Sequence, residues 1–535
     1  MIKMAELVLL NGAIWTVNPD QPLAEAVALG EEKILKVGST KEIKKMVGAD
    51  TQVIDLKGDF VLPGFIDCHT HFLDGGLSLL NIQLREVKSR EEFVARVKEK
   101  TMEIEKGEWI LDGDWDNQQF DPPVLPDKEW IDSVTPFNPV CLYRLDGHMV
   151  LVNSLSLKLA GITKNTSSPV GGEIVKDSET GEPTGILKDA AMNLVMQHIP
   201  EPSLKDKKKA AELALKYANK VGVTSIHDMA NAANFEVYQE LLKENKLTAR
   251  LHVYIPITEV DLYVRLKLKK PFNNNFLKIG GLKGFVDGSL GSSTALFFEP
   301  YTDNPEKTGL LYSHMFPEGI MEKRLMQADK AGLQVAIHAI GDKANHVILD
   351  IFEEVMTLNG ARDRRWRIEH AQHLIPEDIE RIAKLNVIAS VQPYHAIDDG
   401  RWAEKKIGHK RAKYTYAFKS LLEKGTVLAC GSDWTVAPIN PLTGIYAAVT
   451  RQTLDGKNAE GWIPAQIISL EEAIRGYTIN GAYVEFSEDI KGSIEKGKLA
   501  DFVVLNQNLF EIPPEKIKET KVQMTIFNGK IVYRK

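Results

Sequence analysis

The middle of the chain consists of short β-rich segments that alternate with helical patterns, and this alternation limits the possible folds most strongly. The expected strands are Phe65–His71, Thr224–Asp228, Arg250–Ile255, Gly281–Asp287, Gln334–His338, Arg367–His370, Val387–Gln392 and Val427–Ser432. Strands that alternate with helices form parallel sheets. Eight such strands favour a closed (β/α)8 TIM-type barrel over an open sheet.

Helix signals agree with this reading. Ser89 with Glu92 and Ser469 with Glu472 have capping-box spacing. They predict helices over Arg90–Ile104 and over Leu470–Asn480, the latter closed by Gly481. A third helix is expected over Lys207–Val221, where Leu213, Tyr217 and Val221 share one face and Gly222 ends it.

Both ends of the chain have sequence patterns typical of β-strands. The expected N-terminal strands are Glu6–Leu10, Ala13–Val17, Ala26–Leu29, Lys33–Val37 and Gln52–Asp55, and the C-terminal ones are Asp501–Leu505, Val522–Phe527 and Lys530–Tyr533. Asn11-Gly12 is typical of a hairpin turn. We therefore expect one small β-sandwich module that both termini build, from residues 1–60 and 485–535.

A long insertion follows the first barrel strand. About 150 residues separate the first two expected strands, whereas a βα connection usually has only a few. We expect the barrel to span 61–484 and to carry an inserted lid subdomain at about 74–205. Loops at the carboxyl end of barrel strands surround the active site, so this insertion is expected to shape the substrate pocket.

Composition excludes some partners. The chain has 66 Lys and Arg against 73 Asp and Glu, a net charge of −7, which disfavours nucleic acid as a partner. Its three cysteines, Cys68, Cys141 and Cys430, are far apart, which favours a reduced setting without disulfides. No segment is apolar enough for a signal peptide or a membrane span. We expect a cytoplasmic protein with no membrane partner.

Metal-capable residues follow the expected strands. His69 and His71 are two residues apart, so they share a face at one strand end. His338, His370 and Asp433 end later strands, and Lys283 lies within another. The carboxyl ends of barrel strands hold the active site, and histidines with a carboxylate suit zinc or a similar divalent ion.

At these residues the sequence resembles the amidohydrolase superfamily, and within it the amidohydrolase-3 branch, which includes N-substituted formamide deformylases and uncharacterised metal-dependent hydrolases. The resemblance covers nearly the whole chain. Its motifs are Pro63–His71, Asp146-Gly147-His148, Lys283–Ser292, His338–Asp342, Ile368–Gln372, Gly431–Trp434 and Gly492–Asp501.

The resemblance implies a role for each ligand. His69 and His71 would hold one ion, completed by Asp433, and His338 and His370 would hold a second. Lys283 would bridge the two ions after CO2 converts it to a carbamate, because an ammonium group cannot ligate a metal. Some relatives bind one ion, so one or two zinc ions are expected. Without the modification, Lys283 would be a salt-bridged barrel lysine.

The resemblance also implies the reaction: hydrolysis of a non-peptide, amide-type C–N bond in a small molecule by a metal-activated water. Asp433 would act as the general base. Arg144 and His148 are the expected catalytic and substrate-contacting residues of the insertion. Trp115 and Tyr394 would line an apolar pocket, although aromatic residues are more often simple core.

Several alternatives stay open. The same ligands serve ester, lactone or phosphoester hydrolysis, and a catalytically silent barrel acting as an assembly module is a further hypothesis. His227, His373 and His395 also lie near strand ends, where a supporting structural role is favoured over a direct one. Cys68 alternates away from the two histidines beside it and is expected to be inert. We expect a homodimer.

Overall fold

The computed structural model describes residues 4–117, 120–122, 124–144, 149–169, 172–265, 274–291 and 293–535. The chain forms two compact units. One joins Met1–Leu73 to Ala214–Lys535, and the other is Asp74–Leu213.

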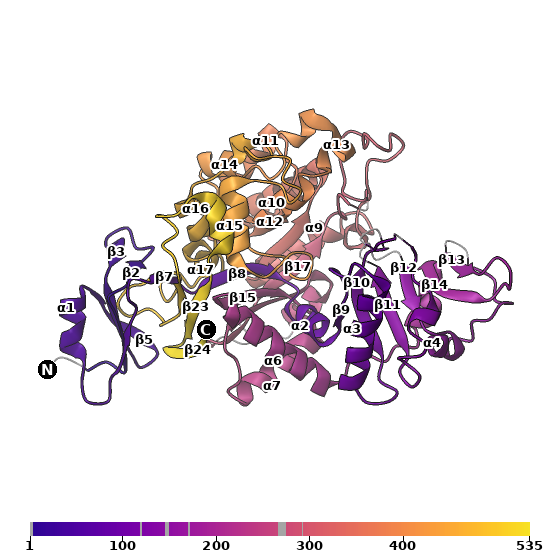
Figure 1. The fold of residues 1–535 in the computed structure, drawn as a ribbon. Helices are drawn as coiled ribbons and strands as arrows, with labels where there is room; N and C mark the ends of the chain where they lie inside the picture. The colour runs from indigo at the N-terminus through magenta and orange to yellow at the C-terminus, as the bar shows by residue number, and fades with distance from the viewer. Residues whose placement is uncertain are drawn as a thin grey trace. The chain divides into compact units, whose positions relative to one another are not determined.

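The first unit contains an eight-stranded parallel barrel (Figure 1). Its strands, in the order in which they pair, are β8 (Phe65–Thr70), β15 (Val223–Met229), β16 (Arg250–Pro256), β17 (Leu277–Phe285), β18 (Gln334–Ala339), β19 (Arg367–His370), β20 (Ile388–Val391) and β21 (Leu428–Cys430). A parallel bridge between Thr70 and Trp434 links the first strand to the segment after the last. The predicted (β/α)8 barrel is therefore confirmed.

One strand boundary differs from the expectation in a way that matters for the site. The strand predicted at Gly281–Asp287 is β17, which begins at Leu277 and ends at Phe285. Lys283 consequently lies two residues before the carboxyl end of its strand. The glycine pair at 280–281 made the start of the strand hard to predict, because glycine is rare in strand interiors.

Helices follow most barrel strands. They are α7 (Ala232–Lys243), α8 (Val260–Arg265), α9 (Ile320–Ala331), α10 (Asp342–Asn359), α11 (Pro376–Lys384), α12 (Pro393–Asp399), α13 (Ala403–Ala412), α14 (Phe418–Glu423), α15 (Pro441–Thr450), α16 (Leu470–Gly476) and α17 (Ile479–Val484). The Ser469–Glu472 capping box is present. The single helix predicted after it is wrong, because the non-helical backbone of Thr478 (φ −136°, ψ −97°) separates α16 from α17.

Both termini build a β-sandwich, as predicted. One sheet pairs β5 (Lys33–Gly38), β4 (Ala26–Gly30), β1 (Leu7–Leu10) and β6 (Gln52–Asp55). The other pairs β24 (Lys530–Arg534), β23 (Val522–Phe527), β22 (Phe502–Leu505), β7 (Phe60–Pro63), β2 (Ala13–Trp15) and β3 (Leu23–Ala24). Their facing side chains, among them Leu9, Val27, Phe502 and Ile526, form one apolar core.

The hairpin expected at Asn11-Gly12 is wrong. β1 and β2 belong to different sheets, so these two residues carry the chain from one layer of the sandwich to the other. Asn11 has the left-handed φ of 55° that the prediction required. Asn528-Gly529 has a similar backbone and does form a hairpin, between β23 and β24. The dipeptide sets the turn, whereas the partners of each strand decide whether the turn closes a hairpin.

The second unit is a mixed sheet with two apolar clusters. Its strands, in pairing order, are β13 (Gly172–Lys176), β14 (Pro183–Asp189), β12 (Met149–Val152), β11 (Val140–Arg144), β10 (Ile110–Trp115) and β9 (Ile82–Gln83). Its helices include α3 (Arg90–Glu103) and α4 (Ser154–Leu159), while α2 (Phe72–Leu80) and α6 (Leu204–Lys220) lie at its boundaries. In the part of the chain that the structure describes, no helix has the length and apolarity to cross a membrane.

Candidate metal centre

The ends of β8 and β21 bring two histidines and an aspartate together. His69 is the fifth residue of β8, and His71 follows the strand. Nε2 of His69 lies 3.5 Å from Oδ1 of Asp433, and Nε2 of His71 lies 3.4 Å from the same oxygen. One ligand atom from each of the three residues lies within 4.8 Å of the other two. This spacing suits a single divalent ion.

Two further histidines contribute rings from β18 and β19. The ring of His370 lies 5.0 Å from the ring of His69 and 4.6 Å from the ring of His338. Nε2 of His338 donates to the carbonyl of Gly288 at 3.0 Å, and Nδ1 of His370 donates to Oε1 of Gln392 at 2.7 Å. Because each acceptor fixes one N–H, the opposite nitrogen of each ring keeps a lone pair for a metal.

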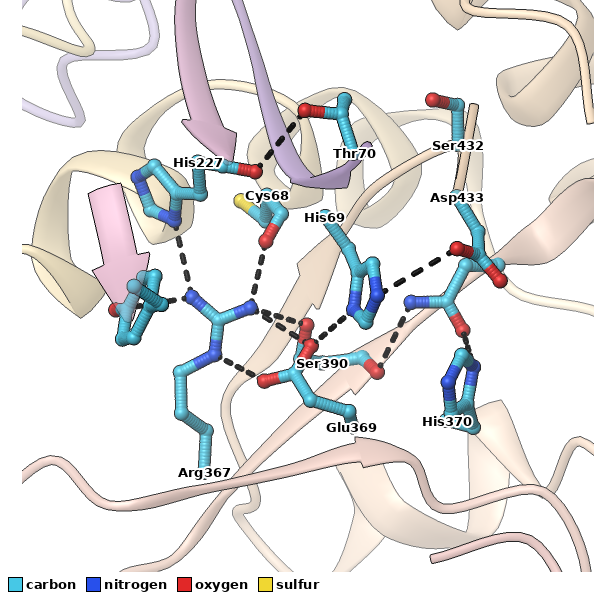
Figure 2. A network of polar contacts seen from close by, with 12 residues as sticks. Cys68, His69, Thr70, His227, Arg367, Glu369, His370, Ser390, Ser432 and Asp433 are labelled. Atoms are coloured by element: carbon cyan, nitrogen blue, oxygen red, sulfur yellow. Dashed lines mark hydrogen bonds and ion pairs between the residues drawn. The ribbon is translucent and has the colours of Figure 1, made fainter. Parts of the chain in front are cut away.

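His69 is held in the same way, by a buried carboxylate (Figure 2). Nδ1 of His69 donates to Glu369, whose carboxylate also accepts from Nε and Nη2 of Arg367. Arg367 further donates to the carbonyl of Cys68 at 2.6 Å and to Oγ of Ser390 at 2.8 Å. A carboxylate behind a histidine orients the ring and strengthens it as a ligand. Neither Arg367 nor Glu369 was assigned a role from sequence.

Electrostatics keep these ligands in the form that binds metal. Burial lowers the pKa of His69 to about 4 and that of His338 to about 3, so both imidazoles are neutral near pH 7. Burial alone would raise the pKa of Asp433, but His69 and the hydrogen bond from His71 hold it well below its ordinary value. Neutral imidazoles around an ionised carboxylate form the ligand set that zinc and related divalent ions prefer.

Two of these residues have a strained backbone. His370 has a φ of 74° and Asp433 a φ of 59°, in the left-handed region that non-glycine residues seldom adopt. Arg367 and Glu369 both point into the barrel, so regular alternation along β19 would turn His370 outward with Ile368. The positive φ breaks this alternation and returns the imidazole to the centre. Such strain is a feature of functional sites.

Lys283 lies buried beside these ligands. Its Nζ has no hydrogen-bond partner among the residues that the structure describes and lies 4.7 Å from the centre of the Phe285 ring. Burial lowers the pKa of Lys283 to about 8, although the nearby carboxylates of Glu369 and Asp433 oppose this shift. The salt bridge considered from sequence is absent at this lysine in the described part of the chain. A buried amine with a lowered pKa has an appreciable neutral fraction and can react as a nucleophile.

The sequence matches the amidohydrolase family over residues 52–533. The chain belongs to this family. It is 43% identical over 543 residues to Protein LONG AFTER FAR-RED 3 of Arabidopsis thaliana, across 99% of this chain and 92% of the relative. It is also 26% identical over 557 residues to the N-substituted formamide deformylase of Arthrobacter pascens, across 100% of this chain and 99% of the relative.

A solved structure supports the same assignment. An uncharacterised metal-dependent hydrolase from Pyrococcus furiosus is 33% identical and aligns with a TM-score of 0.77, covering 95% of this chain and all of that one. The family resemblance inferred from the motifs is thus confirmed. The chain thus belongs to a family of metal-dependent hydrolases, and its clustered histidines and aspartate form a group that could hold a metal ion.

The remaining predicted site residues of this amidohydrolase lie in different places. Within the inserted unit, Arg144 ends β11, where its Nε donates to Oδ1 of Asn117 at 3.1 Å and its Nη2 to Asp116 at 3.3 Å. His148 lies outside the described residues. Trp115 is fully buried in the core of the inserted unit and donates its indole N–H to the carbonyl of Leu142. This position fits the core role that the sequence analysis weighed against a place in a substrate pocket.

Tyr394 lines a hollow of about 430 Å³ that contains none of the predicted metal ligands. The residues around it are Ile397, Thr443, Tyr446, Gln452, Thr453, Leu454, Gly456, Asn458, Ala459 and Lys518. The expectation that Tyr394 contacts substrate at the metal centre therefore lacks support. Nothing in the sequence indicated which face of α12 Tyr394 would occupy.

The three supporting histidines have distinct environments. His227 is fully buried and accepts from Nη1 of Arg367, and His373 bonds through Nδ1 to Oγ1 of Thr415 at 2.8 Å. Both fit the structural role favoured from sequence. His395 differs, because one of its ring nitrogens groups with the ligand atoms of His370 and Asp433.

Proposed function

We propose that the protein is a zinc-dependent hydrolase that cleaves a non-peptide, amide-type C–N bond in a small molecule. The observation that carries the proposal is the common anchoring of His69, His338 and His370. Each ring donates one N–H to a fixed acceptor and keeps its second nitrogen for a metal. A bound divalent ion lowers the pKa of a water molecule and polarises a carbonyl group.

In this proposal Asp433 has two tasks. It holds an ion, and its carboxylate accepts the proton of the attacking water and delivers it to the leaving nitrogen. Its well-lowered pKa keeps it ionised and ready to accept at neutral pH. Its strained backbone fixes the direction of the carboxylate, which reduces the reorganisation needed during the reaction.

We further propose that Lys283 becomes a carbamate. The ammonium form first loses one proton; the neutral amine then attacks the carbon of CO2, a C–N bond forms as one C=O π bond opens, and the nitrogen releases a second proton, which leaves an anionic carbamate. The lowered pKa and the buried, unpartnered Nζ support this step. The carbamate would bridge two ions, with His338 and His370 completing the second. Arg144 and His148 remain our proposed contacts for the substrate carbonyl or for a carboxylate.

The choice of a C–N bond rests on the family and on one relative. The Arthrobacter pascens protein is a deformylase of N-substituted formamides, and this chain aligns with it along its whole length. The name of the Arabidopsis thaliana relative describes no chemistry, so a silent barrel needs its own test. We expect a cytoplasmic homodimer that acts on a small molecule.

The experiment that tests the function combines metal analysis with a substrate panel. Protein reconstituted with zinc should contain one or two ions per chain and hydrolyse at least one N-substituted formamide or other small amide. Hydrolysis confined to esters, lactones or phosphoesters would replace the C–N proposal by its alternative. A protein that binds no divalent ion would support the silent barrel instead.

A further inference from the structure

His395 lies beside the candidate metal ligands, but it is on a helix rather than at the end of a barrel strand. It is the third residue of α12, the helix that follows β20. One of its ring nitrogens lies within 4.8 Å of the ligand atoms of both His370 and Asp433. The rings of His395 and His370 are nearly parallel, at 17°, with centres 6.4 Å apart.

One ring nitrogen of His395, Nε2, is buried without a hydrogen-bond partner among the described residues. The carboxylate of Asp399, on the same helix, is already bonded by the hydroxyl of Tyr416 at 2.6 Å and the amide of Gln372 at 2.9 Å. Buried polar atoms are normally satisfied, so a ligand at this position is expected.

One residue positions both rings of this group. Gln392 accepts Nδ1–H of His370 through its side chain at 2.7 Å, and its backbone carbonyl accepts the backbone N–H of His395 at 3.1 Å. Histidines that ligate a metal are usually held by such hydrogen-bonded supporting residues, and Gln392 has this role here. This group of His370, His395 and Asp433 resembles the first group, in which His69 and His71 also lie beside Asp433.

We propose that His395 is a metal ligand that holds a second ion together with His370 and Asp433 when Lys283 is unmodified. Three protein ligands of this type suffice for a zinc site with an open position. The second ion then has two possible settings: His370 with His338 and the lysine carbamate, or His370 with His395 and Asp433. This inference rests on the metal binding proposed above and extends it to a site that works without CO2.

The test compares metal content with and without CO2. Wild-type protein, His395→Gln and His395→Asn are stripped of metal, equilibrated in CO2-free buffer with cobalt or zinc, and passed through a desalting column. His409→Gln is the matched control, because His409 is an exposed histidine with a side chain 92% accessible. Circular dichroism of the metal-free proteins establishes that each variant is folded.

We expect two ions per chain in wild-type protein and in the control, and one in both His395 variants. Bicarbonate should restore the second ion to the variants, and the visible absorption of bound cobalt should rise accordingly. Two ions in either folded variant without CO2, or one ion in wild-type protein, would overturn the inference. Absence of any bound ion in wild-type protein would instead overturn the proposed function.

A crystal structure of wild-type protein with zinc, grown without CO2, provides a test that needs no variant. Anomalous scattering should place the second ion at about 2.0–2.1 Å from a ring nitrogen of His395. A second ion beyond coordination distance of that ring would overturn the inference.

Discussion

Nδ1 of His69 donates to the carboxylate of Glu369, and this bond crosses the inside of the barrel between two strands 300 residues apart in the sequence. Glu369 is fully buried and bonded to Arg367, which in turn bonds the backbone of β8 beside His69. The candidate ligand His69 is thus oriented through its side chain and through its own strand.

Glu369→Gln should weaken metal binding. The amide is isosteric but carries no charge, so it no longer polarises His69, and loss of such a supporting carboxylate typically costs about 10–100-fold in metal affinity. Zinc titration against a competing chelator measures the change. Glu515→Gln, on the surface, serves as control. Unchanged zinc affinity in Glu369→Gln would show that Glu369 does not support the ligand.

Asp433→Asn should lower kcat by about 10²–10⁴-fold, the usual cost of removing a general base. The amide oxygen can still face an ion but cannot accept the proton of the attacking water. Initial rates on the best substrate of the panel, at measured metal content, give the effect. Asp50→Asn, at an exposed position, should leave kcat unchanged. A nearly normal kcat at equal metal content would move the base to another residue.

Lys283 should take up CO2 faster as the pH rises from 7 to 9. Its pKa of about 8 means that the neutral, reactive amine grows roughly tenfold over this range. Carbon-13 NMR with labelled CO2, at a fixed dissolved concentration, detects the carbamate. Lys283→Ala should give no signal and should regain part of its metal binding with short carboxylic acids. A carbamate signal of equal size in Lys283→Ala would assign it elsewhere.

The metal-free protein should lose stability as the pH falls below about 6.5. An unfolded histidine binds a proton near that pH, whereas folded His338 does so only near pH 3, so the unfolded state binds more protons in between. From pH 6.5 to 5 this histidine alone accounts for about 2 kcal/mol. His338→Gln should therefore show a smaller loss in urea unfolding between pH 7 and 5. An equal loss in both proteins would assign the acid sensitivity to other groups.

Arg250→Ala should destabilise the unit that contains the barrel. Arg250 begins β16 and forms a buried, two-bonded pair with Asp501, at 2.7 and 2.9 Å, just before β22 of the sandwich. Breaking such a pair leaves a buried charge and costs about 3–5 kcal/mol. Urea unfolding measures the loss. Lys516→Ala, which removes an exposed pair with Glu519, should change stability by less than about 1 kcal/mol.

The sequence was sufficient to predict the barrel and the clustering of His69, His71 and Asp433 at its strand ends. Most of the barrel strands are continuous buried runs, as in Val335–His338, and parallel barrels produce such runs because helices cover them. His69 and Asp433 follow from this, since the carboxyl ends of the strands gather at one edge. The turn at Asn11-Gly12 was predicted with the right backbone and the wrong partner, because strand pairing is a long-range property.

The interior of the barrel was harder to foresee. Arg367 and Glu369 are charged residues at positions that an apolar side chain usually fills, and only their mutual neutralisation makes burial tolerable. Alternation would also have placed His370 outside the barrel. The indole of Trp115 satisfies its own N–H within the core, which a list of aromatic residues in an insertion cannot show.

Glu369 and His370 are consecutive residues, yet they serve different ion positions. The first bonds His69 of one candidate ligand group, and the second belongs to the other group. A shift of β19 would displace Glu369 and His370 together, so both ion positions depend on where this strand lies. An ion bound at either position would restrict this strand and prepare the other, and the two metal-binding equilibria should consequently be cooperative.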